Sequence, residues 1–411
     1  MAYRIGTVNG HHNALLMLKR FLESGQYVTN IVYTPGNTGD GYISAEGADD
    51  AAPDETWTIT LTAATTFDVS GSVSGANAGG TVGTVYTSDA GEVTFTLEAG
   101  LTAWSAVGPD TILFDVAAGL DTDKWTVDDF DDSEINGSPN KQLLLNAPGL
   151  GAGEDIYMAI DTYTDAGNSI YTLQLYGNTG YNAAANFLDQ PGNSAPAPRI
   201  LMQNREMKYW VVANGRRVMG VFEVGGVYEW FHMGFLLPYG LPNENPYPLM
   251  IGGSIRALDY IYTSDSYYHA AFFDSSTLTG VYTEDASGRV FDGNWFPVAN
   301  RYADTYDAYA VNTFIIWPWN TRGLLESNQI SGTKFLTWLR PNFDDSYPML
   351  PAIVWKNAST KRTIGQIQGL FATSGSGVNS EDEFLVGGIT YKIFQNTHRT
   401  GYRDWAVLKL E

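Results

Sequence analysis

The chain has 411 residues and no cysteine, which excludes disulfide frameworks, thiolate metal sites and cysteine nucleophiles. Its 45 acidic side chains outnumber 23 Lys and Arg, and the formal net charge of −22 repels phosphate backbones, so nucleic acid is not expected as a partner. The 44 glycines, 25 tyrosines, 19 phenylalanines and 11 tryptophans, with only 17% charged residues, indicate a turn-rich β protein with aromatic side chains suited to large interfaces.

Neither secretion nor membrane insertion is expected from the sequence. The N-terminal segment lacks the basic region and following apolar run of a secretory signal, and no apolar run approaches the roughly 18 residues that span a bilayer. A chain without cysteine also suits a reducing compartment. We therefore expect synthesis in the cytoplasm.

Residues 11–24 predict an amphipathic helix. Its apolar side chains recur at helical spacing and are Leu15, Leu16, Leu18, Phe21 and Leu22. Asn9 or Asn13 can cap the start of this helix, and Gly25 can end it.

Residues 34–116 are expected to form an inserted domain, because the composition changes after Tyr33 to Gly, Ala, Thr, Ser and Asp. Short segments that alternate apolar and polar residues between turns are predicted to be strands: Thr56–Leu61, Thr66–Val69, Thr81–Tyr86, Glu92–Leu97 and Ile112–Val116. Strands at this spacing predict a small, Ig-like antiparallel β-sandwich.

Residues 1–33 and 117–411 are expected to form the main, discontinuous domain, since aromatic-rich sequence returns near Lys124 and the opening helix is too short to fold alone. Asn214-Gly215 and Gly225-Gly226 are the strongest hairpin signals. The strand candidates are Gln142–Leu145, Asp155–Thr162, Ser169–Leu175, Lys208–Ala213, Arg217–Val224, Val227–Leu237, Tyr268–Phe273, Phe335–Leu339, Ala352–Trp355, Phe384–Phe394 and Asp404–Leu410. No strand–helix alternation is visible, so the predicted fold class is mainly β, an antiparallel β-sandwich domain with an inserted Ig-like sandwich and one N-terminal amphipathic helix.

Four segments resemble tail and virion structural proteins of tailed bacteriophages. They read TWTITLTAATTFDVSGSVSGANAGGTVGTVYTS with EVTFTLEAG, YWVVANGRRVMGVFEVGGVYEWFHMGFLLPYGLPNENPYPLMIGGS, LRPNFDDSYPMLP, and FLVGGITYKIFQNTHRTGYRDWAVLKL. The first resembles a module that recurs in many phage structural proteins, and the other three, taken in order, are more specific.

This resemblance implies a non-enzymatic structural component of a phage tail, in the baseplate or neck region. It implies a virion protein that assembles in the host bacterial cytoplasm, with copies of itself and other tail or baseplate proteins as partners. It brings no catalytic motif and no cofactor.

An acidic cluster is the one candidate for a metal site. Asp129, Asp131, Asp132 and Glu134 could offer oxygen ligands to calcium. A calcium loop needs ligands at alternate positions and a terminal Glu. Phe130 and Ile135 break this pattern and the terminal Glu is missing, so a solvated acidic loop is the favoured interpretation.

No catalytic residue is assigned from the sequence. The five histidines form no metal-binding motif, Ser254 lacks the nucleophile elbow, and the paired acids Asp344 and Asp345 lie in a turn context. The alternatives to a structural role are a carbohydrate-binding module that recognises a host surface glycan, with Trp317 and Trp319 as platforms, and a polysaccharide depolymerase.

The segment Pro238–Pro248 is a candidate for a subunit contact. Its prolines exclude a regular helix or central strand, yet it carries Tyr239, Leu241 and Tyr247, which are costly to leave exposed. It is expected to pack either on its own domain or on a neighbouring subunit, and the sequence leaves both open.

Overall fold

The structure is a computed structural model in which the chain forms two compact units. It describes residues 2–23, 25–49, 51–118, 123–132, 140–149, 155–194, 197–239, 247–254, 280–283, 294–297, 313–317, 347–357, 362–395 and 405–410. Residues 16–124 make up one unit, called the sandwich unit, and residues 3–15 with 125–411 make up the other, called the main unit.

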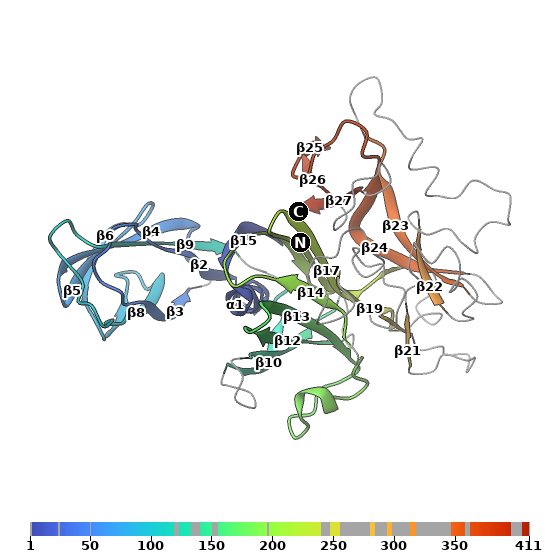
Figure 1. Ribbon diagram of the computed structural model, residues 1–411, viewed down its shortest axis with the longest axis horizontal. Coiled ribbons are helices and arrows are strands. Elements are labelled where there is room, and N and C mark those ends of the chain that lie inside the picture. The colour runs from blue at the N-terminus through green and yellow to red at the C-terminus, as the bar shows by residue number, and fades with distance from the viewer. Residues whose placement is uncertain are drawn as a thin grey trace. The chain divides into compact units, whose positions relative to one another are not determined.

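The sandwich unit is built from two antiparallel sheets (Figure 1). The first contains, in spatial order, β2 (Gln26–Tyr33), β9 (Thr111–Ala118), β4 (Glu55–Ala63), β5 (Thr66–Gly71) and β6 (Gly75–Thr81). The second contains β3 (Ile43–Ala48), β8 (Val93–Leu97) and β7 (Val85–Thr87). Strand β2, which precedes residue 34, pairs with β9 along most of its length.

Alternating side chains of both sheets meet in one aromatic core, as a sandwich requires. Trp57 and Phe114 stack across neighbouring strands of the first sheet, and Phe95 of the second meets Phe114 edge to face at 5.7 Å between ring centroids. The predicted sandwich class is therefore confirmed. The single strand predicted at Thr81–Tyr86 is wrong, because Gly83 adopts a positive φ of 76° and the chain turns there between β6 and β7.

The main unit contains three antiparallel sheets. Sheet A has the order β1 (Ala2–Asn9), β15 (Glu206–Asn214), β16 (Arg217–Val224), β17 (Val227–Phe235), β19 (Leu249–Gly252), β20 (Gly280–Thr283) and β21 (Asn294–Pro297). Sheet D has the order β10 (Thr126–Asp131), β11 (Gln142–Ala147), β12 (Ile156–Asp165), β13 (Ile170–Asn178) and β14 (Arg199–Met202). Sheet F has the order β22 (Thr313–Trp317), β23 (Leu350–Asn357), β24 (Arg362–Thr373), β27 (Trp405–Leu410), β26 (Ile389–Gln395) and β25 (Glu383–Val386), with β18 (Leu237–Pro238) paired to β24. A short 3-10 helix, η1 (Phe187–Asp189), lies in the connection after β13.

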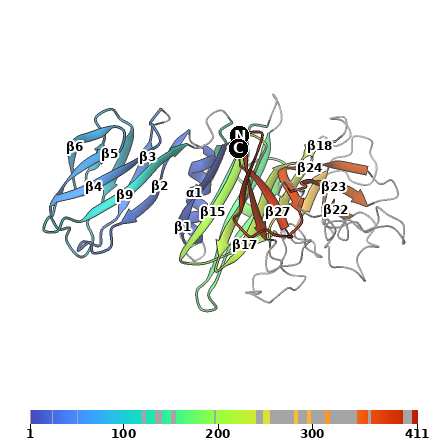
Figure 2. The ribbon, with the colours of Figure 1, turned by 90° about the horizontal axis from the view of Figure 1, so that it is seen from above.

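Sheet A is the middle layer of the main unit. Trp210, Met219 and Trp230 of sheet A share a buried cluster with Ile364 and Leu408 of sheet F. In Figure 2 the orange and red strands of sheet F lie alongside the yellow-green strands of sheet A. Strands β12, β13 and β14 of sheet D contact β17 on the same central sheet. Both faces of β16 and β17 are consequently buried, which explains their nearly continuous apolar sequence.

The predicted hairpins are confirmed, and a third one follows the same rule. Gly225-Gly226 joins β16 to β17 with φ angles of 61° and 84°, and Gly387-Gly388 joins β25 to β26 with the same two angles. Positive φ at both central positions defines the tight hairpin turn that matches strand twist. The continuous strand predicted at Phe384–Phe394 is therefore two strands.

The predicted helix is confirmed as α1 (His11–Glu23). Gly10, with a φ of 84°, makes the turn from β1 into α1, and the Asn13 side chain donates to the carbonyl of Asn9 at 2.7 Å. Two strand predictions, Tyr268–Phe273 and Phe335–Leu339, lie outside the described residues.

Candidate interaction surfaces

Two connections at one end of the sandwich unit are fixed by a buried carboxylate. These connections, residues 33–42 and 98–110, are called the loop end below. Asp110 is fully buried and accepts hydrogen bonds from the backbone N–H groups of Thr38, Gly39 and Ser105 at 2.6, 2.8 and 2.9 Å. Burial raises the pKa of Asp110, but the three amide bonds outweigh it and hold the pKa below its ordinary value. The carboxylate therefore ties the two connections together.

Trp104 completes the loop end. Its indole N–H donates to the carbonyl of Glu98 at 3.2 Å, and its ring lies so close to Gly39 and Gly41 that a Cβ on either would come within 2.6 Å of a ring atom. Asp40 accepts a hydrogen bond from the backbone N–H of Thr102 at 2.7 Å. Glycine is required at both positions by this close approach.

The ordered loop end exposes apolar side chains. Leu101 is fully exposed, Val107 is 90% exposed, and Tyr42 is more than half exposed. Most loop side chains that point to solvent are polar, whereas residues 99–109 contain no charged residue. These apolar side chains lie on connections that hydrogen bonds hold in place, which would lower the entropic cost of any contact that they make.

Strand β1 provides an exposed edge in the main unit. It is the strand at one edge of sheet A, with β15 as its neighbour. Its side chains alternate between partly buried and exposed, and Tyr3 and Ile5 are 47% and 40% exposed. Such an edge with apolar side chains is a common surface for association.

A second exposed edge lies at β25, the last strand of sheet F. Leu385 and Val386 are exposed beside the Gly387-Gly388 turn. This edge differs from β1 in charge, because Glu381, Asp382 and Glu383 precede its apolar residues.

Charge is strongly segregated along the chain. Residues 1–22 contain Arg4, Lys19 and Arg20 and no Asp or Glu. Residues 23–123, which include nearly all of the sandwich unit, contain 15 Asp and Glu and no Lys or Arg. The sandwich unit is therefore acidic throughout its sheets and loops.

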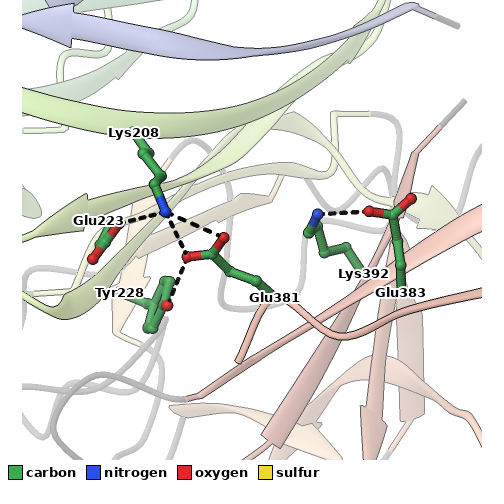
Figure 3. Close-up of polar contacts among 6 residues, drawn as sticks. All are labelled: Lys208, Glu223, Tyr228, Glu381, Glu383 and Lys392. Atoms are coloured by element: carbon green, nitrogen blue, oxygen red, sulfur yellow. Dashed lines mark hydrogen bonds and ion pairs between the residues drawn. The ribbon is translucent and has the colours of Figure 1, made fainter. Parts of the chain in front are cut away.

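A polar cluster connects sheet A to the segment before β25 (Figure 3). The ammonium group of Lys208 lies 3.3 Å from a carboxylate oxygen of Glu381 and 3.5 Å from one of Glu223. The Tyr228 hydroxyl donates to Glu381 at 3.0 Å, and Glu381 has an unusual positive φ of 71°. Because Lys208 is half exposed, these ion pairs are screened, and the cluster serves chiefly to orient the turn.

Beside this cluster Lys392 pairs with Glu383 at 2.6 Å (Figure 3). The same ammonium group lies 5.8 Å from the ring centroid of Trp210, a cation–π distance. Lys392 thus joins sheet F to the aromatic core that it shares with sheet A.

Fully buried ionisable groups are a feature that sequence reasoning missed. Glu229 accepts a hydrogen bond from the Ser254 hydroxyl, and burial raises the pKa of Glu229 to about 8. Burial and the nearby Arg217 lower the pKa of His232 to about 3. Each lies on an otherwise apolar strand, where periodicity gives no signal for them.

The predicted acidic cluster is only partly within the described residues. Asp129 and Asp131 lie in β10, Asp132 follows it with an oxygen 3.9 Å from the ammonium group of Lys141, and Glu134 lies outside the described residues. Among the residues that the structure describes, no group of three His, Asp or Glu could hold a metal ion. No described helix is long and apolar enough to cross a membrane.

The predicted contact residues differ in their surroundings. Tyr247 packs edge to face on Phe235 at 4.7 Å, and its hydroxyl donates to the carbonyl of Asn178 at 3.2 Å, so it packs within its own unit. Tyr239 is 41% exposed and donates to the Gln366 side chain at 2.6 Å. Leu241, Trp319 and the side chain of Trp317 lie outside the described residues.

No protein-family model matches the chain, and no curated protein matches it. Among solved structures, two crystal forms of Xanthomonas campestris FlgL, in space groups H3 and C2, match 24% of this chain at 17% and 19% identity. The matches cover 33% and 32% of the FlgL chains, and their TM-scores are 0.17 and 0.18. A likeness this low supports no conclusion about fold or function.

Proposed function

We propose that the chain is a non-enzymatic structural component of a bacteriophage tail, in the baseplate or neck region. It acts by binding copies of itself and other tail proteins in a symmetric ring of the virion. It assembles in the host bacterial cytoplasm.

The observation that carries this proposal is the exposure of apolar side chains on rigid supports in both units. Leu101 and Val107 project from the loop end, and Tyr3 and Ile5 project from β1. A monomer would leave these side chains in water, where burying a Leu or Val side chain would be worth about 1.5–3 kcal/mol. The sequence resemblance to phage tail proteins supports the setting.

Sedimentation velocity of the purified full chain, at low micromolar to submillimolar concentrations, tests the proposal. We expect concentration-dependent assembly into a closed ring, seen as one discrete large species and as rings by negative-stain microscopy. A chain that stays monomeric throughout would contradict the proposal. Incubation with host polysaccharide separates the alternatives, since a depolymerase releases reducing ends and a receptor module binds glycan without cleavage.

A further inference from the structure

Two adjacent histidines, His11 and His12, begin helix α1, and their rings lie against each other. The ring centroids are 4.1 Å apart, and the His11 ring is also 5.2 Å from the ring of Tyr171 in β13. The Nε2 atom of His11 lies 2.8 Å from the hydroxyl oxygen of Thr164 in β12, so the start of the helix is bonded to sheet D. The side chains of His11 and His12 are called the histidine pair below.

The histidine pair fits its site only in the neutral form. One ring nitrogen of each residue is buried without a hydrogen-bond partner, namely Nδ1 of His11 and Nε2 of His12. A neutral imidazole carries one N–H group and an imidazolium carries two. Whichever tautomer the neutral ring adopts, its protonated form therefore places an N–H group and a positive charge where no acceptor lies, which is far more costly than an unpaired neutral nitrogen.

The charged groups that face the histidine pair are cations. Lys141 precedes β11 and lies close enough for its charge to act on His12. Arg205 precedes β15, and its carbonyl accepts the N–H of Gly10 directly before the helix. Helix α1 has no Asp or Glu in its first turn, so the positive end of its dipole also opposes protonation of both rings.

The acidic side chains of the neighbouring strands are directed elsewhere. Asp132 lies beside Lys141, and Asp165 accepts hydrogen bonds from Asn168. Asp161 lies on the face of β12 opposite Thr164, because side chains alternate along a strand. Among the residues that the structure describes, no carboxylate forms a hydrogen bond or ion pair with either ring of the pair. A proton on the pair would therefore have no counter-charge.

The pKa values of the pair agree with this geometry. Burial and the neighbouring His12 lower the pKa of His11 from 6.5 to about 3, and burial and Lys141 lower the pKa of His12. A proton consequently binds more tightly when the helix start is released into water than when it lies on sheet D. The packed arrangement loses stability as the pH falls below 6.5, and this loss continues down to about pH 3 for His11.

We propose that the histidine pair is an acid-sensitive switch, in which protonation of the pair releases the first turn of α1 from sheet D. The chain passes between the two units within α1, after Leu15, and passes back after Lys124. Release of the first turn therefore frees the chain at the first of these two connections. The glycine turn at Gly10, where φ is 84°, lies directly before the pair and permits this movement. The switch goes beyond the proposed function and does not rest on it.

Hydrogen–deuterium exchange of the full chain, measured by mass spectrometry at about pH 7.5 and about pH 5, tests the proposal on both sides of the ordinary histidine pKa. Labelling times are scaled for the pH dependence of the chemical exchange rate. We expect peptides from α1 to exchange at least about tenfold faster at the lower pH than this scaling predicts, because each pH unit below 6.5 favours the released helix by about that factor. Peptides from β16, which is buried on both faces, should keep their scaled rates.

Three variants identify the groups responsible. The pair variant, His11→Gln with His12→Gln, cannot be protonated and should show no acceleration in α1. The control variant His232→Gln removes a histidine that is fully buried in β17, and its α1 peptides should accelerate as in wild type. Lys141→Gln removes a cation that opposes protonation of the folded pair, so its helix should be released only at a lower pH than in wild type.

A measurement on wild type alone keeps the test valid if a variant fails to fold. Nuclear magnetic resonance of the ring nitrogens, in chain labelled at histidine, follows the protonation of each ring. We expect the signals of His11 and His12 to become those of the protonated form only over the pH range in which α1 exchange accelerates. Rings that take up protons while α1 keeps its protection would show that the packed helix tolerates the charge, and would overturn the inference.

Three results of the exchange experiment would also overturn it. The first is a wild-type chain whose α1 peptides follow the scaled rate at about pH 5. The second is a pair variant whose α1 peptides accelerate as much as those of wild type. The third is equal acceleration in α1 and β16, because the whole chain would then lose stability in acid and no local release would exist. All of these results leave the proposed function standing, since assembly at neutral pH does not require the switch.

Discussion

Glu229 lies fully buried in β17, where burial raises the pKa of its carboxyl from an ordinary 4.5 to about 8. At a pH between these two values, the Glu229 carboxyl therefore keeps its proton in the folded state and releases it in the unfolded chain. The free energy of unfolding falls as pH rises through this window, by up to about 1.4 kcal/mol per pH unit for one proton. Asp161, whose pKa burial raises to about 7, contributes a slope of the same sign.

Glu229→Gln should consequently flatten the pH dependence of stability. Glutamine keeps an acceptor for the Ser254 hydroxyl but cannot ionise, so the variant loses less stability than wild type between about pH 5 and about pH 9. Urea unfolding at several pH values measures the slope, and Glu206→Gln, at an exposed position of β15, is the matched control. Equal slopes for the variant and wild type would show that Glu229 ionises freely in the folded state.

Glu55 performs a different task in the sandwich unit, where it is nearly fully buried at the start of β4. Its carboxylate accepts hydrogen bonds from the backbone N–H groups of Val73 and Ser74 at 2.8 and 2.9 Å. Glu55→Ala leaves these donors without their acceptor and should lower the free energy of unfolding by about 2 kcal/mol. Asp54→Ala, at the exposed neighbouring position, should change it by less than about 0.5 kcal/mol. A Glu55→Ala chain that unfolds at the same urea concentration as wild type would contradict this account of the turn.

Two hairpin turns of the main unit have glycines at positive φ. Gly226 has a φ of 84°, and a Cβ placed on it would meet nothing within 4 Å. Gly226→Ala therefore isolates the backbone cost, which should destabilise the main unit by about 1–2 kcal/mol. Gly167→Ala is the control, because its φ is not positive and an added Cβ would make an ordinary contact at 3.5 Å. Thermal melts that shift equally for the two variants would show that turn conformation is not the cause.

Short sequence patterns were sufficient to predict the helix and one hairpin, but they were insufficient to predict strands β1 and β6. The helix and the Gly225-Gly226 hairpin follow from short sequence patterns that hold independently of their surroundings. Strand β6 was missed because its sequence, GANAGGT, has almost no strand propensity and becomes a strand by pairing with β5. Strand β1 was missed because its partner β15 follows it by roughly two hundred residues, and only tertiary structure brings them together.

The candidate surfaces were harder to predict than the fold class. Asp110 accepts hydrogen bonds from Thr38 and Gly39, which are about seventy residues away in the sequence. The fixed conformation of the loop end could therefore not be inferred from either connection alone. Tyr247 was proposed as a contact residue because the prolines around it exclude regular structure and its ring is costly to leave exposed, but Phe235 and Asn178 give it partners within its own unit. The composition shows that aromatic residues are abundant, but it does not show which of them are buried in the core and which lie on the surface.

At the scale of the whole molecule, the charge distribution predicts a response to salt. The net charge is −22, and residues 23–123 in the sandwich unit carry acidic but no basic side chains. Repulsion among these negative charges weakens the folded state. Raising sodium chloride from about 0.01 to about 0.1 M shortens the screening length from roughly 30 to 10 Å and should raise the melting temperature by a few degrees. Calorimetry at both salt concentrations measures the shift, and a lower melting temperature at the higher concentration would show that attractive ion pairs dominate.

The proposed function places the chain in a phage tail, and cryo-electron microscopy of the tailed particle tests this central claim most directly. The account predicts density for the three-layer main unit, repeated with cyclic symmetry around the tail axis, with neighbouring copies in contact. The result that would contradict it is a particle whose tail contains no copies of the chain, or contains single copies that do not touch one another.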